Sequence, residues 1–145
     1  MKKYLLLAAL IAMPLTEVYA DATINYTIGW LREDPGAVWY QGAVDLKNIK
    51  TGIITRLVPV QAQADPPNSG KISLVAGEYE ITAGYYECSY PECPRGEKFP
   101  EYPDPSCQLP KQKSFEEGKS YQINFYLLDA QNLCDVKEIS TKKAR

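Results

Sequence analysis

The sequence contains no histidine among its 145 residues. Histidine is the side chain that most often acts as a general base near neutral pH, and it is a frequent metal ligand. Its absence excludes Ser-His and Cys-His nucleophile pairs and every metal site built on an imidazole. We expect neither a metal nor a cofactor.

The sequence also lacks an excess of charge of one sign. It has 16 basic and 18 acidic residues, and without residues 1–20 it has 14 and 17, a net charge of −3. A surface that binds nucleic acid or an anionic membrane needs cationic side chains to neutralise phosphates. Neither is expected as a partner.

The one long apolar run lies at the N-terminus and is too short to span a membrane. Lys2 and Lys3 precede the run Tyr4–Leu15, and Val18-Tyr19-Ala20 offers a small residue for cleavage before Asp21. A membrane-spanning helix needs about 20 apolar residues. The pattern predicts a bacterial Sec signal peptide over 1–20, no membrane anchor after cleavage, and one domain over 21–145 in the periplasm or the medium.

The mature part contains four cysteines, an even number that predicts two disulfides in an oxidising compartment. A four-thiolate zinc site is the alternative, but intervals of four, thirteen and twenty-six residues do not supply two close Cys-x2-Cys pairs. Of the three pairings we expect Cys93 with Cys107 and Cys88 with Cys134. The first would close a local loop, and the second would tie a strand end to the C-terminal segment.

The mature sequence has no stretch with a helical period. Apolar side chains instead occupy every second position, as in half-buried strands. Strands are predicted at 24–30, 38–47, 53–60, 71–75, 79–85, 113–115, 121–127 and 133–139. Asn48–Gly52 and Ala76–Gly77 are predicted to turn two hairpins, residues 61–70 to form an exposed loop, and Pro59 to mark a sheet edge or exit.

About seven such strands can bury their apolar faces by packing two sheets together or by closing a barrel, and we expect the packed sheets. The expected fold class is therefore all-β, a small antiparallel β-sandwich with a long disulfide-tethered loop. Trp30 and Tyr121 are predicted to be core residues, because they continue the apolar alternation of their strands. Trp39 lies on the polar face of its strand and is a candidate for stacking against a sugar.

Four short stretches resemble the prealbumin-like modules of carboxypeptidase regulatory domains. They are Gly42–Asn48, Lys50-Thr51-Gly52, Asn68–Leu74 and Ala76–Ile81, about 40 of 145 residues. The shared features are a strand that ends in a Thr-Gly turn, a Gly before a short strand, and a Gly-x-Tyr strand. The resemblance implies a β-sandwich with a structural or binding role and no catalytic residue. Pro66–Ser69 departs from the acidic turn of those modules.

Residues 89–110 interrupt the strand pattern with six prolines and two cysteines. A long loop inside a compact domain is usually functional or disordered, and a disulfide with fixed proline φ angles favours an ordered binding loop. We expect it to recognise a protein partner; the alternative is that Phe99 and Tyr102 cover the open end of the sandwich and the loop contacts no partner. The candidate binding residues are Tyr90, Arg95, Phe99 and Tyr102, with Trp39 outside the loop.

Two other functions stay open. Cys93-Pro94-Arg95-Gly96 presents a basic residue on a stiffened segment, as many inhibitors of serine proteases do, so the chain could inhibit a hydrolase. A small glycoside hydrolase would need paired carboxylates, which Glu87, Glu92, Glu97, Glu101 and Asp104 offer. The primary expectation is an exported, non-catalytic binding or structural module.

Overall fold

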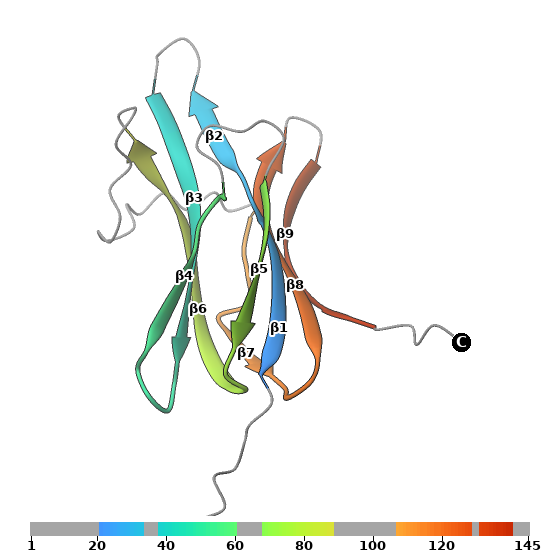
Figure 1. Cartoon of the computed structure of the whole chain (residues 1–145). Coiled ribbons are helices and arrows are strands. Elements are labelled where there is room, and N and C mark those ends of the chain that lie inside the picture. Colours follow the sequence, from blue (N-terminus) through green and yellow to red (C-terminus); the bar gives the residue numbers. More distant parts are fainter. Residues whose placement is uncertain (1–20, 34–37, 61–67, 89–106, 129–130, 141–145) are drawn as a thin grey trace, which may run out of the picture.

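Two β-sheets pack face to face in this protein (Figure 1). The computed structural model describes residues 21–33, 38–60, 68–88, 107–128 and 131–140. These ranges hold nine β-strands and no helix, so none of their elements is an apolar helix that could cross a membrane. The predicted all-β sandwich is confirmed.

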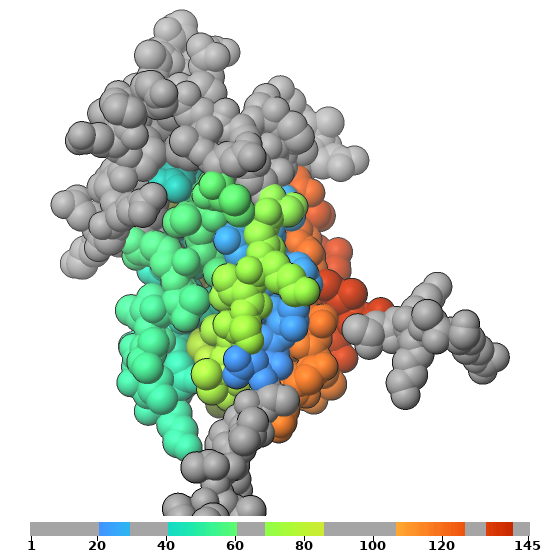
Figure 2. Space-filling view, in the orientation of Figure 1, coloured from blue at the N-terminus to red at the C-terminus, as the bar shows by residue number. Residues whose placement is uncertain are grey.

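The first sheet, sheet A, has four strands in the order β5-β1-β8-β9. Their bounds are β5 Asn68–Leu74, β1 Ala22–Ile28, β8 Ser120–Leu128 and β9 Gln131–Ile139. Neighbouring strands are antiparallel except for β1 and β8, which run parallel. Figure 2 shows these strands side by side on the surface, from β5 in yellow-green through β1 in blue to β8 and β9 in orange and red.

The second sheet, sheet B, has five strands, and all of its pairings are antiparallel. Their bounds are β2 Trp30–Glu33, β3 Val38–Asn48, β4 Ile54–Leu57, β6 Gly77–Cys88 and β7 Gln112–Phe115. β3 pairs with β6 on one side, while β2 and β4 share its other side. β6 in turn pairs with β7 over Gly77–Glu80.

The core lies between the sheets and follows the predicted alternation. Ile24 and Ile123 are 0 % exposed, Tyr121 1 % and Ile81 7 %. The ring of Phe115 packs edge-on against Tyr121, with 5.0 Å between ring centroids. Because every second side chain of a strand points to the same face, each sheet buries one apolar face and leaves the other to solvent.

The chain changes sheet at Gly29, which corrects the expectation of one strand over 24–30. β1 belongs to sheet A and β2 to sheet B. The Gly29 N–H donates to the Phe125 carbonyl in sheet A, and the Gly29 carbonyl accepts from the Gly42 N–H in sheet B, both at 3.0 Å. The apolar alternation passes through this corner unbroken, so the pattern could not reveal it.

β5 and β6 do not form the predicted hairpin. β5 pairs with β1 in sheet A and β6 with β3 in sheet B, so the Ala76–Gly77 turn connects the two sheets. Gly77 has a φ of 156°, in the range that glycine adopts readily. The loop predicted over 61–70 is also too long, because β5 already begins at Asn68.

The predicted hairpin at Asn48–Gly52 is confirmed. The Asn48 side-chain oxygen accepts from the backbone N–H groups of Lys50 and Thr51, both at 3.0 Å, and Gly52 has a φ of 73°. Such a side chain bonded to its own turn is a common way to close a short loop. Pro59 follows the end of β4, in agreement with the predicted exit from the sheet.

The predicted disulfide pairing is wrong. Cys107 is bonded to Cys134, with 5.2 Å between their Cα atoms. Cys134 lies opposite Phe125 on the inner side of β9, where residue 107 approaches the sheet, and neither expected bridge is compatible with this one. The observed bridge also leaves too few thiolates for a four-cysteine zinc site.

Candidate functional site

Most of the predicted binding residues lie outside the described ranges. This holds for Tyr90, Arg95, Phe99 and Tyr102, and for four of the five loop carboxylates. Trp39 lies in β3, in register with Arg32 of β2 and Cys88 of β6. The structure describes the backbone of Trp39 and Glu87 but not their side chains. The candidate site therefore has to be built from the described end of the loop, 107–110, and what it contacts.

Residues 107–111 bridge the two sheets. Their first residue, Cys107, is joined to β9 of sheet A by the disulfide. Their last, Lys111, accepts a 2.8 Å hydrogen bond at its carbonyl from the Ile81 N–H in sheet B. The disulfide at Cys107 and the hydrogen bond at Lys111 thus attach the two ends of this segment to different sheets.

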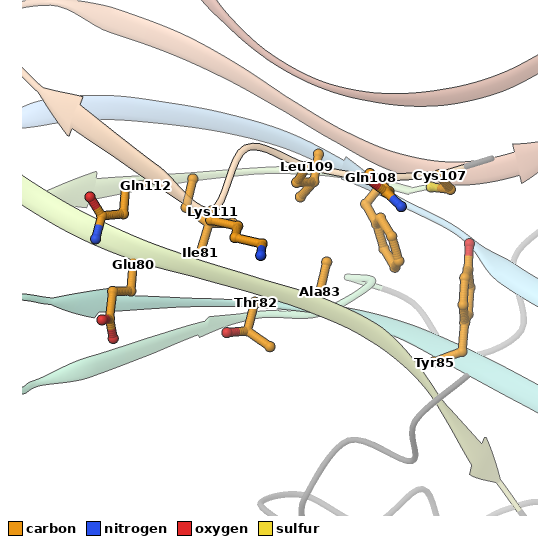
Figure 3. A pocket seen from close by; sticks show the side chains of 11 residues that line it. Glu80, Ile81, Thr82, Ala83, Tyr85, Cys107, Gln108, Leu109, Lys111 and Gln112 are labelled. Atoms are coloured by element: carbon orange, nitrogen blue, oxygen red, sulfur yellow. The ribbon is translucent and has the colours of Figure 1, made fainter. Parts of the chain in front are cut away.

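A groove of about 860 Å³ lies between this segment and β6, which we call the β6 groove (Figure 3). β7 ends its pairing at Glu80, and beyond the hydrogen bond between Ile81 and Lys111 β6 continues without β7 beside it. The groove is lined by Glu80, Ile81, Thr82, Ala83 and Tyr85 of β6, by Cys107, Gln108, Leu109, Lys111 and Gln112, and by Phe125 of β8.

The floor of the β6 groove is apolar and continuous with the core. Phe125 is 3 % and Tyr85 2 % exposed, and their rings pack with centroids 5.0 Å apart. Ala83 and Leu109 are half-buried and pack against the same core from opposite walls. An apolar group that entered between them would remove further apolar surface from water, which favours binding.

The rim of the β6 groove is polar. Figure 3 shows the Lys111 side chain pointing into the space between its own segment and β6. No described acidic side chain forms an ion pair with Lys111, whereas Glu80 pairs with Lys47, with 3.4 Å between the charged atoms. A ligand with an acidic group would therefore find a cation that no described carboxylate neutralises.

The described part of the groove offers little catalytic chemistry. Glu80 is the only carboxylate among its lining residues, whereas glycoside hydrolysis needs two. Among the residues that the structure describes, no group of three His, Cys, Asp or Glu side chains could hold a metal ion.

Sequence reasoning missed Leu109, Lys111, Ala83 and Phe125 as groove residues. Leu109 carries the one available signal, a large apolar side chain in the otherwise polar and proline-rich stretch 103–114. The others could not be found, because their proximity depends on the Cys107–Cys134 bridge and on where β7 stops pairing.

Comparison with known proteins assigns no family to this chain. It matches no protein-family model, no curated protein sequence and no solved structure. The geometry and chemistry of the described residues are therefore the basis for a function.

Proposed function

We propose that this chain is an exported, non-catalytic module that binds a protein partner at the β6 groove and the loop that leads into it. The observation that carries the proposal is the groove itself: an apolar floor of Phe125 and Tyr85, a polar rim, and a wall held at both ends. Binding sites for ordered ligands commonly combine an apolar surface with a few polar groups that fix orientation.

Two observations support the export part of the proposal. The Cys107–Cys134 disulfide fits an oxidising, extracytoplasmic environment. The first strand begins at Ala22, one residue after the predicted cleavage site, so signal peptidase would remove 1–20 without touching the sheet. The resemblance to prealbumin-like modules stays a prediction that agrees with a binding role.

The chemistry of the partner follows from the two walls. An apolar side chain fits between Ala83 and Leu109, and an acidic group beside it meets the Lys111 ammonium. The bridge at Cys107 limits how far this wall can move, so less conformational entropy is lost when the partner binds.

A photo-crosslinking amino acid at position 109 tests this function in the periplasm of a cell that expresses the chain. We expect one adduct, identified by mass spectrometry and reproduced with the two purified proteins. The same amino acid at Ile54, which is exposed on β4, is the matched control and should not give that adduct. Lys111→Glu should remove the adduct at 109 and leave the unfolding midpoint close to that of the wild type.

Identical adducts from positions 109 and 54, or none from 109, would contradict the proposal. A chain in which a Gly/Ser linker replaces 89–106, with Cys88→Ser to avoid a free thiol, separates the contributions of the loop and the groove. Loss of the adduct in this chain assigns a share of the binding to the loop.

A further inference from the structure

The outer face of sheet A carries an unusual set of side chains, independent of the β6 groove. On its two central strands, β1 and β8, the outward positions whose side chains the structure describes hold only uncharged polar residues and one tyrosine. They are Thr23, Asn25, Thr27, Ser120, Gln122, Asn124 and Tyr126. We call these seven residues the amide face. Figure 2 shows β1 and β8 on this side of the molecule between β5 and β9.

The outer face of sheet B is the internal comparison, because it belongs to the same chain in the same solvent. Its central strands β3 and β6 point Asp45, Lys47, Glu78 and Glu80 outward. Arg56 of β4 pairs with Asp45 through two 2.7 Å contacts. Charged residues are the usual solution for a solvated sheet face, so solubility does not explain why the amide face has none.

Strand propensity does not explain the amide face either. Asparagine is depleted in β-strands, yet Asn25 and Asn124 occupy interior positions of two adjacent strands. Asn124 is only 8 % exposed and both of its side-chain polar atoms are hydrogen-bonded, whereas Asn25 donates a single long hydrogen bond of 3.4 Å to the Tyr121 carbonyl. Asn25 is therefore the departure from strand propensity that points to a functional site.

Hydrogen bonds fix several of these side chains. The Gln122 amide nitrogen donates to Asn124 Oδ1 at 2.9 Å and to Thr27 Oγ1 at 3.3 Å. Thr27 Oγ1 lies 3.0 Å from Ser69 Oγ, and Asn124 Nδ2 donates to Asp135 Oδ1 at 2.8 Å. This network reaches all four strands of sheet A. Side chains held in place before binding lose less entropy when a ligand arrives.

The network leaves hydrogen-bonding capacity facing outward. Asn25 and Gln122 are in register on β1 and β8, and neither side-chain oxygen accepts a hydrogen bond from a described residue. Tyr126 follows Asn124 on the same face and is half-buried, so part of this residue is open to solvent. The amide face thus combines fixed amides, hydroxyls and an aromatic side chain on two adjacent strands about 5 Å apart, and it runs for about 20 Å along β8 from Ser120 to Tyr126.

We propose that the amide face binds an uncharged oligosaccharide chain. A sugar presents both donors and acceptors, which match amides and hydroxyls, and it presents a C–H face that packs on an aromatic ring. A neutral glycan carries no charge for the central strands to complement, and those strands offer none. The charged residues nearest to Asn25 and Gln122 lie on the two edge strands. Lys71 of β5 is in register with Asn25, and Lys137 of β9 is in register with Gln122 and forms an ion pair with Asp135.

The test uses the oxidised mature chain, 21–145, and three insoluble neutral polysaccharides: amylose, cellulose and chitin. We expect retention on at least one of them, unchanged in about 1 M salt because no charge is involved. Asn25→Ala with Gln122→Ala, and separately Tyr126→Ala, should weaken retention by about tenfold or more. Lys47→Gln with Glu78→Gln on sheet B, two residues outside the β6 groove, is the matched control and should retain wild-type binding.

Folding is monitored by the urea midpoint of each variant. If the double alanine variant unfolds, Gln122→Glu replaces it, since this change keeps the side-chain shape and should still weaken retention. Absence of retention on all three polysaccharides overturns the proposal. So does retention that salt abolishes, stronger retention on the anionic polysaccharide alginate, or equal loss in the sheet B control. A folded variant at Asn25 and Gln122 that binds like the wild type overturns it as well.

Discussion

Gly42 of β3 lies beside Gly29, where the chain passes from sheet A to sheet B. Its N–H donates to the Gly29 carbonyl, and a Cβ added at Gly42 would lie 2.6 Å from that oxygen and 2.9 Å from Ile28 Cγ2. Both neighbours belong to the corner between β1 and β2 and cannot move without disturbing it. Absence of a side chain at Gly42 is therefore a requirement of the fold.

Gly42→Ala is predicted to lower the free energy of unfolding by about 2 to 3 kcal/mol, the cost of overpacking a rigid interior site. Urea denaturation measures the loss. Gly70→Ala is the matched control: the atoms nearest to its Cβ would be those at the outer end of the half-buried Tyr26 ring, a side chain rather than backbone. An equal or larger loss at Gly70 would show that the corner is not the rigid point.

The surroundings of Asp135 on β9 lower the pKa of its carboxyl group. Desolvation acts to raise its pKa, but hydrogen bonds from Lys137 and Asn124 and the Lys137 charge outweigh it, so the pKa is lowered. The Lys137 ammonium lies 2.6 Å from one carboxylate oxygen. A lowered folded pKa means that Asp135 stabilises the protein fully above its unfolded pKa of about 3.9 and loses this contribution as pH falls through the folded value.

An NMR titration of the Asp135 carboxyl is predicted to give a pKa below the ordinary range, and Lys137→Met should move it back upward. Asp135→Asn should correspondingly flatten the pH dependence of unfolding in acid, from about pH 5 downward. A carboxyl pKa that is normal or raised in the wild type, or that does not respond to Lys137→Met, contradicts this account.

At the scale of elements, the alternation of apolar residues located most strands but not their partners. The strand over 121–127 and the Asn48–Gly52 turn are where the sequence predicted them. The hairpin between β5 and β6 is not, because a turn of the same length can return a strand to its own sheet or pass it to the opposite one. Both outcomes bury Leu74 and Tyr79, so periodicity does not distinguish them.

The bridge between Cys107 and Cys134 ties the groove wall to β9, with a sequence separation of 27. Cys107→Ser with Cys134→Ser is predicted to lower the free energy of unfolding by about 3.5 kcal/mol on the chain-entropy model. Denaturation under non-reducing conditions measures this loss.

Digestion of the unreduced protein gives an independent check of the same bridge. The predicted fragment joins the peptide of Cys107 to that of Cys134, which leaves Cys88 and Cys93 for each other. A fragment that joins Cys88 or Cys93 to either of the first two would refute the pairing.

At the scale of the molecule, Asp21, the first residue after the predicted cleavage site, is bonded to sheet A. The Asp21 carboxylate accepts a 2.6 Å hydrogen bond from Ser73 Oγ, and its carbonyl accepts one of 3.3 Å from the Gly118 N–H. Ala22 follows with no exposed surface, on a strand between β5 and β8. A chain that starts at Asp21 thus keeps every described contact of β1.

Mass measurement of the protein recovered from the periplasm or the medium is predicted to give a chain that begins at Asp21. Ala20→Pro, which disfavours cleavage at that bond, should give the unprocessed chain in the membrane fraction instead. A soluble product that retains residues 1–20 would contradict the predicted signal peptide.

The sequence alone determined the fold class, the core and the turn at Asn48, because a period of two and the chemistry of a turn are local properties of the chain. Burial of Ile24, Ile81 and Ile123 followed from that period. The tertiary structure decided which strands are neighbours, which cysteines meet, and which residues form the β6 groove and the amide face. Each depends on contacts between distant segments. Such contacts are selected by how two sheets pack together, and no local pattern records that choice.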